Sequence, residues 1–145
     1  DKSTLMNDGT DITVIACGSC VFEAMQAARI AKADGGLSVR VINMHTIKPI
    51  DREAVLKAVA ETRRIITVED HEVMGGLGSA VAEVVAESGK GCAFKMLGHQ
   101  NAFSTIGLQE DLLALAKIDA NGIAETIQEM MHADFEADDD WADEF

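Results

Sequence analysis

Short apolar segments alternate along this sequence with longer segments of helical periodicity, and this alternation restricts the possible folds more than any other feature. Four segments rich in β-branched side chains predict buried strands: residues 11–17, 37–43, 64–69 and 92–97. Between them, apolar residues recur every three or four positions, which predicts helices. Two shorter helices are expected near residues 112–115 and 123–131. Strands joined by helices in this way predict an α/β, three-layer domain with a mostly parallel sheet and right-handed crossovers.

Two capping signals help to place the predicted helices. The segment Asp34-Gly35-Gly36 ends the first helix, because glycine readily adopts the left-handed conformation of a helix C-terminus. Asp51 is a predicted N-cap. The helix that follows it is expected to carry Val55, Leu56 and Val59.

The charge balance excludes several classes of partner. The 145 residues include 12 basic and 25 acidic side chains, a formal net charge of −13, which repels phosphate backbones and anionic lipid. We therefore expect neither a nucleic-acid partner nor a membrane. A mean hydropathy of +0.08, no long uncharged apolar run and no basic-then-apolar N-terminal stretch predict a cytoplasmic protein.

Three segments are expected along the chain: an N-terminal leader at residues 1–10, one domain at 11–133 and an acidic tail at 134–145. The tail contains seven carboxylate side chains and no Lys or Arg, so it repels itself. It has too little apolar surface to offset the entropy lost on ordering, and we predict that it is disordered. Docking of its aromatic residues on a partner is the alternative: Phe135, Trp141 and Phe145.

A pair of cysteines, Cys17 and Cys20, flanks the end of the first predicted strand. A helix N-terminus lowers the pKa of a thiol, so a redox dithiol is one interpretation. No tryptophan lies nearby to form the usual platform, and the third cysteine, Cys92, has no partner with which to complete a zinc site. We therefore predict that both residues pack at a tight turn as reduced, unreactive thiols.

A glycine-rich turn, Gly75-Gly76-Leu77-Gly78-Ser79, follows the third predicted strand and opens a helix. Free amide groups at such a turn bind anions. Val81 stands where a dinucleotide fingerprint needs its third glycine, and Ala80 stands where a phosphate-binding loop needs lysine. A structural or interface role is therefore predicted, with anion binding as the alternative.

Four polar residues, Glu69-Asp70-His71-Glu72, precede these glycines at the carboxyl end of the strand, where ligands gather in open α/β sheets. Neighbouring side chains on an extended segment point in opposite directions, so we predict an interface with another domain and not a catalytic pair. His45 and His99 follow other strands, and no metal site is predicted. No catalytic, cofactor-binding or metal-binding residue is assigned. The candidate interface or anion-binding residues are Glu69, Asp70, His71, Gly75, Gly76, Gly78 and Ser79.

Three stretches together resemble the C-terminal domain of transketolase-type thiamine diphosphate enzymes. They are the opening strand and Gly-Ser turn at 11–19, the segment Lys48-Pro49-Ile50-Asp51, and the run from Thr67 to Glu83 with its Gly-Gly-x-Gly helix start. A weaker match at 98–123 resembles the closing segment of that domain. Deoxyxylulose-phosphate synthases and the beta subunits of 2-oxo-acid dehydrogenases have the same domain. The closing segment favours transketolase, particularly the kind whose C-terminal section is a separate polypeptide.

The resemblance implies a sheet with one antiparallel edge strand and a role in two-carbon ketol transfer between sugar phosphates. In that family thiamine diphosphate and a divalent metal bind between the two preceding domains of a dimer, and this sequence lacks both the Gly-Asp-Gly metal motif and the activating glutamate. We therefore expect the chain to bind no cofactor by itself and to be inactive alone. Its expected role is structural, in a homodimer, with the other domains or an N-terminal subunit of the same enzyme as partners.

Two alternatives belong to other classes. The chain could be an independent anion-binding or CxxC redox module, or the equivalent domain of deoxyxylulose-phosphate synthase or of a 2-oxo-acid dehydrogenase beta subunit. A thiamine-binding segment upstream of residue 1 would separate the enzyme-domain interpretation from the independent module.

Overall fold

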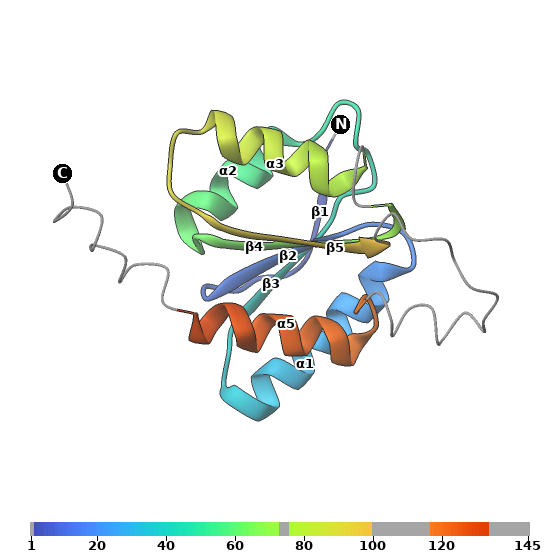
Figure 1. Cartoon of the computed structure of the whole chain (residues 1–145), viewed down its shortest axis with the longest axis vertical. Helices are drawn as coiled ribbons and strands as arrows, with labels where there is room; N and C mark the ends of the chain where they lie inside the picture. The colour runs from blue at the N-terminus through green and yellow to red at the C-terminus, as the bar shows by residue number, and fades with distance from the viewer. Residues whose placement is uncertain (1, 73–75, 100–116, 134–145) are drawn as a thin grey trace, which may run out of the picture.

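Strands and helices alternate in the computed structural model as the sequence predicts (Figure 1). The structure describes residues 2–72, 76–99 and 117–133; the helix expected near 112–115 lies outside them. The elements, in chain order, are β1 (Thr4–Asn7), β2 (Ile12–Ala16), α1 (Cys20–Gly35), β3 (Val39–Asn43), α2 (Arg52–Glu61), β4 (Arg64–Glu72), α3 (Leu77–Glu87), β5 (Ala93–His99) and α5 (Ala120–His132).

The strands form one sheet in the order β1-β3-β2-β4-β5. Strands β2, β3, β4 and β5 are parallel to one another, and β1 pairs antiparallel with β3 at one edge. The prediction of a mostly parallel sheet with one antiparallel edge strand is therefore confirmed. Helices α2 and α3 cover one face of the sheet, and α1 and α5 cover the other (Figure 1).

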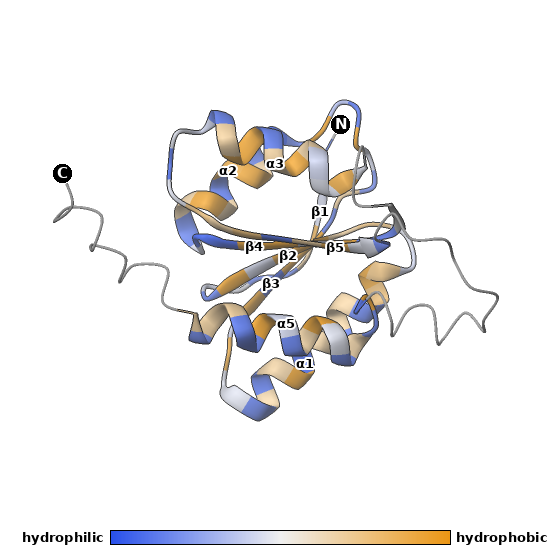
Figure 2. Ribbon diagram, in the orientation of Figure 1, coloured by the Kyte–Doolittle hydropathy of each residue, from blue (hydrophilic) through white to orange (hydrophobic). Residues whose placement is uncertain are grey.

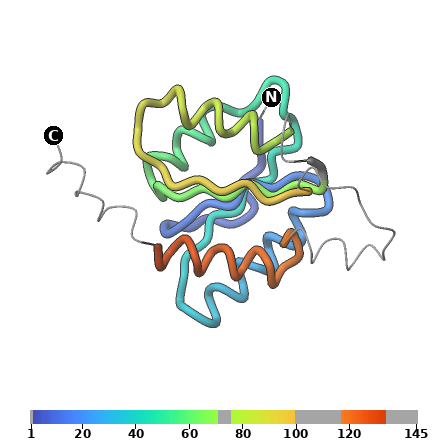
Figure 3. The backbone as a smooth tube through the Cα atoms, in the orientation of Figure 1, coloured from blue at the N-terminus to red at the C-terminus, as the bar shows by residue number. Residues whose placement is uncertain are grey.

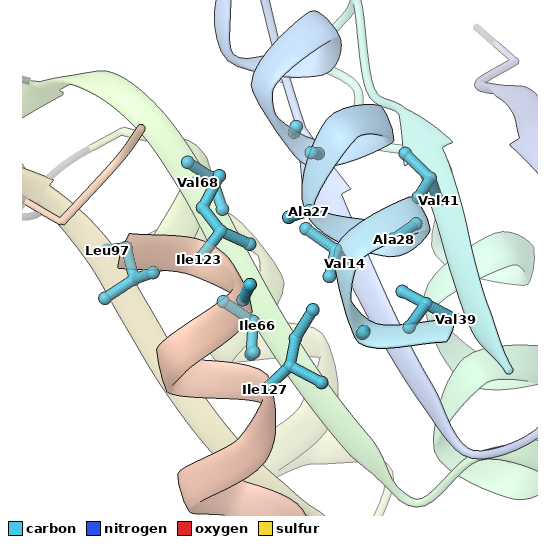
Figure 4. Close-up of a cluster of buried hydrophobic side chains, with 14 of the residues drawn as sticks. Val14, Ala27, Ala28, Val39, Val41, Ile66, Val68, Leu97, Ile123 and Ile127 are labelled. Carbon is cyan, nitrogen blue, oxygen red and sulfur yellow. The ribbon is translucent and has the colours of Figure 1, made fainter. Parts of the chain in front are cut away.

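The two faces of the sheet carry separate apolar clusters, because successive strand residues point to opposite sides. Val14 of β2 belongs to the cluster under α1 and α5, whereas its neighbour Ile15 belongs to the cluster under α2 and α3. Figure 4 shows the first cluster, in which Ile123 and Ile127 of α5 lie beside strand residues such as Ile66. Figure 2 shows hydrophobic and hydrophilic bands alternating along the helices, as expected when only one face of each helix packs on the sheet.

Helix α1 approaches the sheet through small side chains. Its buried residues are Cys20, Ala24, Ala27, Ala28 and Ala31. Such residues let a helix backbone lie close to the strands and leave room for α5 beside it, and the tube in Figure 3 shows these two helices on the same side of the sheet. On α2, Val55 and Val59 are buried, whereas Leu56 is 38% exposed.

Strand β1 lies inside the segment that the sequence suggested was a leader. All four of its residues are exposed, yet it pairs with β3 and its first residue, Thr4, is opposite Asn43, the last residue of β3. Just before it, the backbone N–H and the hydroxyl of Ser3 both donate to Asp51 Oδ2, at 2.9 and 2.8 Å. Oδ1 of Asp51 accepts from the amide of Ala54 at 3.2 Å, so the predicted N-cap of α2 is confirmed.

The carboxyl ends of β2, β3, β4 and β5 lie at one edge of the sheet, which we call the carboxyl edge; the arrowhead of β5 points toward it in Figure 1. Because β1 is antiparallel and begins opposite Asn43, the chain also enters the sheet at this edge. Among the described residues, no helix is both long and apolar enough to cross a membrane.

Candidate functional site at the carboxyl edge

A buried carboxylate organises the carboxyl edge. Glu69, near the end of β4, is 0% exposed. Its Oε1 accepts the N–H of Leu77 at 2.9 Å, and its Oε2 accepts the N–H of Gly78 at 2.7 Å. These are the first two amides of α3, whose N-cap, Gly76, has no side chain with which to satisfy them. We call this arrangement the Glu69 clasp: a negative charge of the chain occupies the positive end of its own helix.

Gly78 makes the Glu69 clasp sterically possible. A Cβ atom added at this position would lie 2.8 Å from Met96 Sδ and 3.0 Å from Thr67 Oγ1. The start of α3 therefore packs directly on β4 and β5, so closely that a side chain at this position would have to displace Met96. The glycine-rich turn predicted from the sequence thus has a packing explanation at this residue.

A second polar pair lies next to the Glu69 clasp. His99 Nε2, at the end of β5, is 2.6 Å from Asp70 Oδ1, at the end of β4, and both side chains are about one-third exposed. The sequence grouped Asp70 with His71, but the structure pairs it with a histidine 29 residues away. The two histidines expected near this edge have different neighbours, since His45 is exposed and its Nδ1 lies 3.3 Å from Thr46 Oγ1.

The other candidate residues lie as follows. His71 belongs to β4, and its side chain is outside the described part of the structure, as is Gly75. Gly76 and Ser79 are half-buried at the start of α3. The structure therefore brings Glu69, Gly76 and Gly78 together in one turn and places Asp70 beside it.

The cysteine pair lies against these carboxylates. Burial, followed by the charge of Glu69, raises the pKa of the Cys17 thiol. Burial is also the main cause that raises the pKa of Cys20 to about 12, with the charge of Asp70 the next largest. Both effects act against the thiolate, in spite of the helix N-terminus. Burial and the neighbouring carboxylates therefore do not favour the redox-module alternative.

The described residues do not fit thiamine diphosphate, the cofactor that the resemblance implies for the intact enzyme. Its diphosphate needs amide or cationic donors, and its metal needs a group of oxygen ligands. The Leu77 and Gly78 amides are already bonded to Glu69, whose charge opposes an incoming anion. Within the described ranges, no group of three or more His, Cys, Asp and Glu side chains is arranged to hold a metal ion.

The sequence analysis did not predict the hydrogen bonds made by two charged side chains, Glu23 and Arg40. Glu23 Oε2, in the first turn of α1, accepts the amide of Ala120 at 2.8 Å and so fixes the start of α5. At the opposite end of the sheet, the buried side chain of Arg40 donates to Asp8 Oδ1 at 3.0 Å and to Glu61 Oε2 at 2.7 Å. For Arg40 a signal existed, because an arginine between Val39 and Val41 of a buried strand requires an acidic partner.

These features define the class of the protein. It is an α/β domain with a five-stranded sheet, and a carboxylate of the chain itself accepts the first two amides of the helix that follows the described glycines. The family model described as "Transketolase, C-terminal domain" matches residues 1–123. This match covers most of the chain, and the chain therefore belongs to the transketolase C-terminal domain family.

Individual relatives agree with this assignment. A protein named as a transketolase C-terminal section, from Methanocaldococcus jannaschii, is 40% identical over 130 residues, which are 90% of this chain and 40% of that protein. A 1-deoxy-D-xylulose-5-phosphate synthase from Halothermothrix orenii is 39% identical over 126 residues, 86% of this chain and 20% of that protein. The chain thus spans less than half the length of these relatives.

A solved structure shares the fold closely. It is described as a split-gene transketolase in the form of an inactive β4 tetramer. Its TM-score is 0.83 at 32% sequence identity, and the match covers 90% of this chain and 42% of that one. The α/β architecture is therefore that of the transketolase C-terminal domain.

Proposed function

We propose that this chain supplies structural and dimerisation contacts to a transketolase-type enzyme and contributes no catalytic group. The Glu69 clasp carries the proposal. A glycine-rich helix start is the place where a phosphate of a substrate or cofactor would bind, and here its first two amides hold Glu69 instead. The intact enzyme is proposed to transfer two-carbon ketol units between sugar phosphates. Thiamine diphosphate and a divalent metal, held on other domains, would supply the chemistry of that transfer.

The carboxyl edge is the proposed contact surface. Glu69 and Gly78 are buried and shape the turn, whereas Asp70, Gly76 and Ser79 are half-buried. His71 and Gly75, which adjoin them in sequence, are proposed as members of the same surface. The chain enters the sheet beside this edge, because Ser3 is bonded to Asp51 and Thr4 lies opposite Asn43.

The length of the relatives supports a role inside a larger enzyme. This chain matches two-fifths of the Methanocaldococcus jannaschii protein and one-fifth of the synthase, so both proteins contain further sequence beyond the matched domain. A solved β4 tetramer of a split-gene transketolase is described as inactive. We infer by analogy that this chain also needs a further subunit or domain for activity.

Calorimetric titration with thiamine diphosphate and magnesium tests the first half of the proposal. We expect no binding to the chain alone, because its described residues offer neither the free amides nor the metal ligands. Dissociation constants of about 1 μM or tighter, a binding free energy near −8 kcal/mol, would contradict the proposal.

Assembly tests the second half. The chain is mixed with the thiamine-binding section of the same enzyme, and complex formation and ketol transfer are measured. Asp70→Arg is expected to weaken assembly by about tenfold or more, because it places the wrong charge in the contact. The control is Asp34→Arg, which makes the same change at an exposed position near the end of α1. Equal effects of the two variants would show that the carboxyl edge is not the contact surface.

A further inference from the structure

A groove beside helix α1 combines an apolar floor with two cationic side chains. It has a volume of about 350 Å³, near the lower end of the range for ligand pockets. The apolar side chains in its lining are Met25, Ala28, Leu37 and Val39, and the cations are Arg29 and Lys32. We call it the α1 groove; it lies away from the carboxyl edge, between α1, the end of β1 and the start of β3.

Both cations of the α1 groove are available to a ligand. Arg29 and Lys32 are exposed, and neither has a hydrogen bond or ion pair to another residue in the described part of the chain. Asp8 also lines the groove, but its Oδ1 accepts from the amide of Gly9 at 2.8 Å and from Arg40 at 3.0 Å. The charge left for a ligand is therefore positive, on a chain whose net charge is −13.

The C-terminal segment of the chain has the complementary chemistry. Trp141 stands between Asp138-Asp139-Asp140 on one side and Asp143-Glu144 on the other. An indole ring fits an apolar floor, and carboxylates on both sides of it would meet Arg29 and Lys32 at the rim.

The segment starts close enough to reach the groove. Gln128 of α5 lies against Gly35, with its Nε2 3.0 Å from the position of an added Cβ, and the next residue, Gly36, lines the α1 groove. From Gln128 to Ala133 the chain advances by only ~8 Å of helix or helix end. The eight residues from Ala133 to Trp141 span up to ~26 Å when extended, which is ample to pass the end of α1.

In place of the disorder that composition alone predicts for the tail, we propose that residues 138–145 bind in the α1 groove of their own chain, with Trp141 on the apolar floor and the flanking carboxylates paired with Arg29 and Lys32. The groove is thus a site for an acidic peptide that contains an aromatic residue. This inference is independent of the proposed function, because neither the groove nor the tail belongs to the carboxyl edge.

The fluorescence of the whole chain tests this directly. Trp141 is its single tryptophan, and it has no tyrosine. At low ionic strength we expect Trp141 to emit at a shorter wavelength than it does in the denatured chain. We also expect its fluorescence to be protected from quenching by acrylamide. Arg29→Glu with Lys32→Glu should shift the docking equilibrium toward the free tail by about tenfold, as expected for the loss of two exposed ion pairs.

The matched control reverses two other exposed lysines, Lys90→Glu with Lys95→Glu, which lie outside the α1 groove and change the net charge equally. It should keep the blue-shifted, protected emission, and circular dichroism should show that both double variants are folded.

Three results would overturn the proposal. The first is emission of the unaltered chain that equals that of the denatured chain. The second is an equal response of the two double variants, which would mean that the tail senses only net charge. The third is protection that increases with protein concentration, because the tail would then bind a second copy instead of its own groove.

Discussion

Two charged side chains are buried at opposite ends of the sheet, and the protein satisfies them in different ways. At the carboxyl edge, Glu69 is 0% exposed and both of its oxygens accept backbone amides at the start of α3. At the other end, Arg40 is 6% exposed and donates to the carboxylates of Asp8 and Glu61. Both observe the rule that a buried charge needs partners.

The two buried charges differ in whether their hydrogen-bond partners can move or be solvated by water. The partners of Glu69 are main-chain groups of a helix, which cannot titrate, rotate away or be replaced. The partners of Arg40 are side chains that remain 69% and 42% exposed, so water can solvate them when the arginine is lost. We therefore expect the carboxyl edge to be rigid and intolerant of substitution, and the Arg40 end to be adjustable.

Removal of the carboxylate should have the largest effect. Glu69→Ala leaves two buried amides without acceptors, and we expect the free energy of unfolding to fall by about 3 kcal/mol. Glu69→Gln keeps one acceptor oxygen and should lose roughly half as much. Urea unfolding near neutral pH measures both changes. A loss below about 0.5 kcal/mol for Glu69→Ala would mean that water replaces the carboxylate.

Removal of the buried cation should cost less. Arg40→Met preserves much of the packing of the side-chain stem, and its two released carboxylates are exposed enough to be rehydrated, so we expect a loss of about 1 kcal/mol. The same urea titration gives the comparison with Glu69→Ala. Equal losses at the two ends would remove the distinction between backbone and side-chain partners.

The smallest expected effect concerns acid pH. The amide of Gly9, and next the side chain of Arg40, hold the pKa of Asp8 below its ordinary value of 3.8. A carboxylate with a lowered folded-state pKa stabilises the protein above 3.8 and loses that contribution as the pH falls through its folded value. Asp8→Asn should therefore flatten the decline of stability below pH ~4.

The Arg40→Met background provides the control for this experiment. There the hydrogen bond from Arg40 is gone, so Asp8→Asn should flatten the profile less than it does in the unaltered protein. An identical flattening in both backgrounds would assign the low pKa of Asp8 to the Gly9 amide alone.

The sequence predicts an element correctly where its buried residues recur at regular intervals, and it misses an element where they do not. The apolar runs that form β2 to β5 are visible because each is short and is separated from the next by a segment of helical periodicity. Strand β1 gave no such signal, since all four of its residues are exposed and only its pairing with β3 makes it a strand. The glycines at 75–78 predicted a helix start, but not the direction of the Glu69 side chain.

The pairs between distant residues were also beyond the sequence. Arg40 bonds to a residue 32 positions earlier and to another 21 positions later, and Asp70 lies beside His99, 29 positions later. These partners depend on which strands become neighbours. Local patterning does not encode that order, so the candidate site could be located from the sequence but its contacts could not.

The bonds between Ser3 and Asp51 have a consequence for how such a domain can be divided or joined genetically. Ser3 is hydrogen-bonded through both its amide and its hydroxyl, so a polypeptide fused upstream would be attached at a fixed position on the domain. The length of the linker would then determine how far the fused polypeptide can move from the domain. A gene split upstream of residue 2 keeps this anchor. A split at residues 8–10 would instead remove β1 and leave the edge of β3 open to pairing with foreign strands.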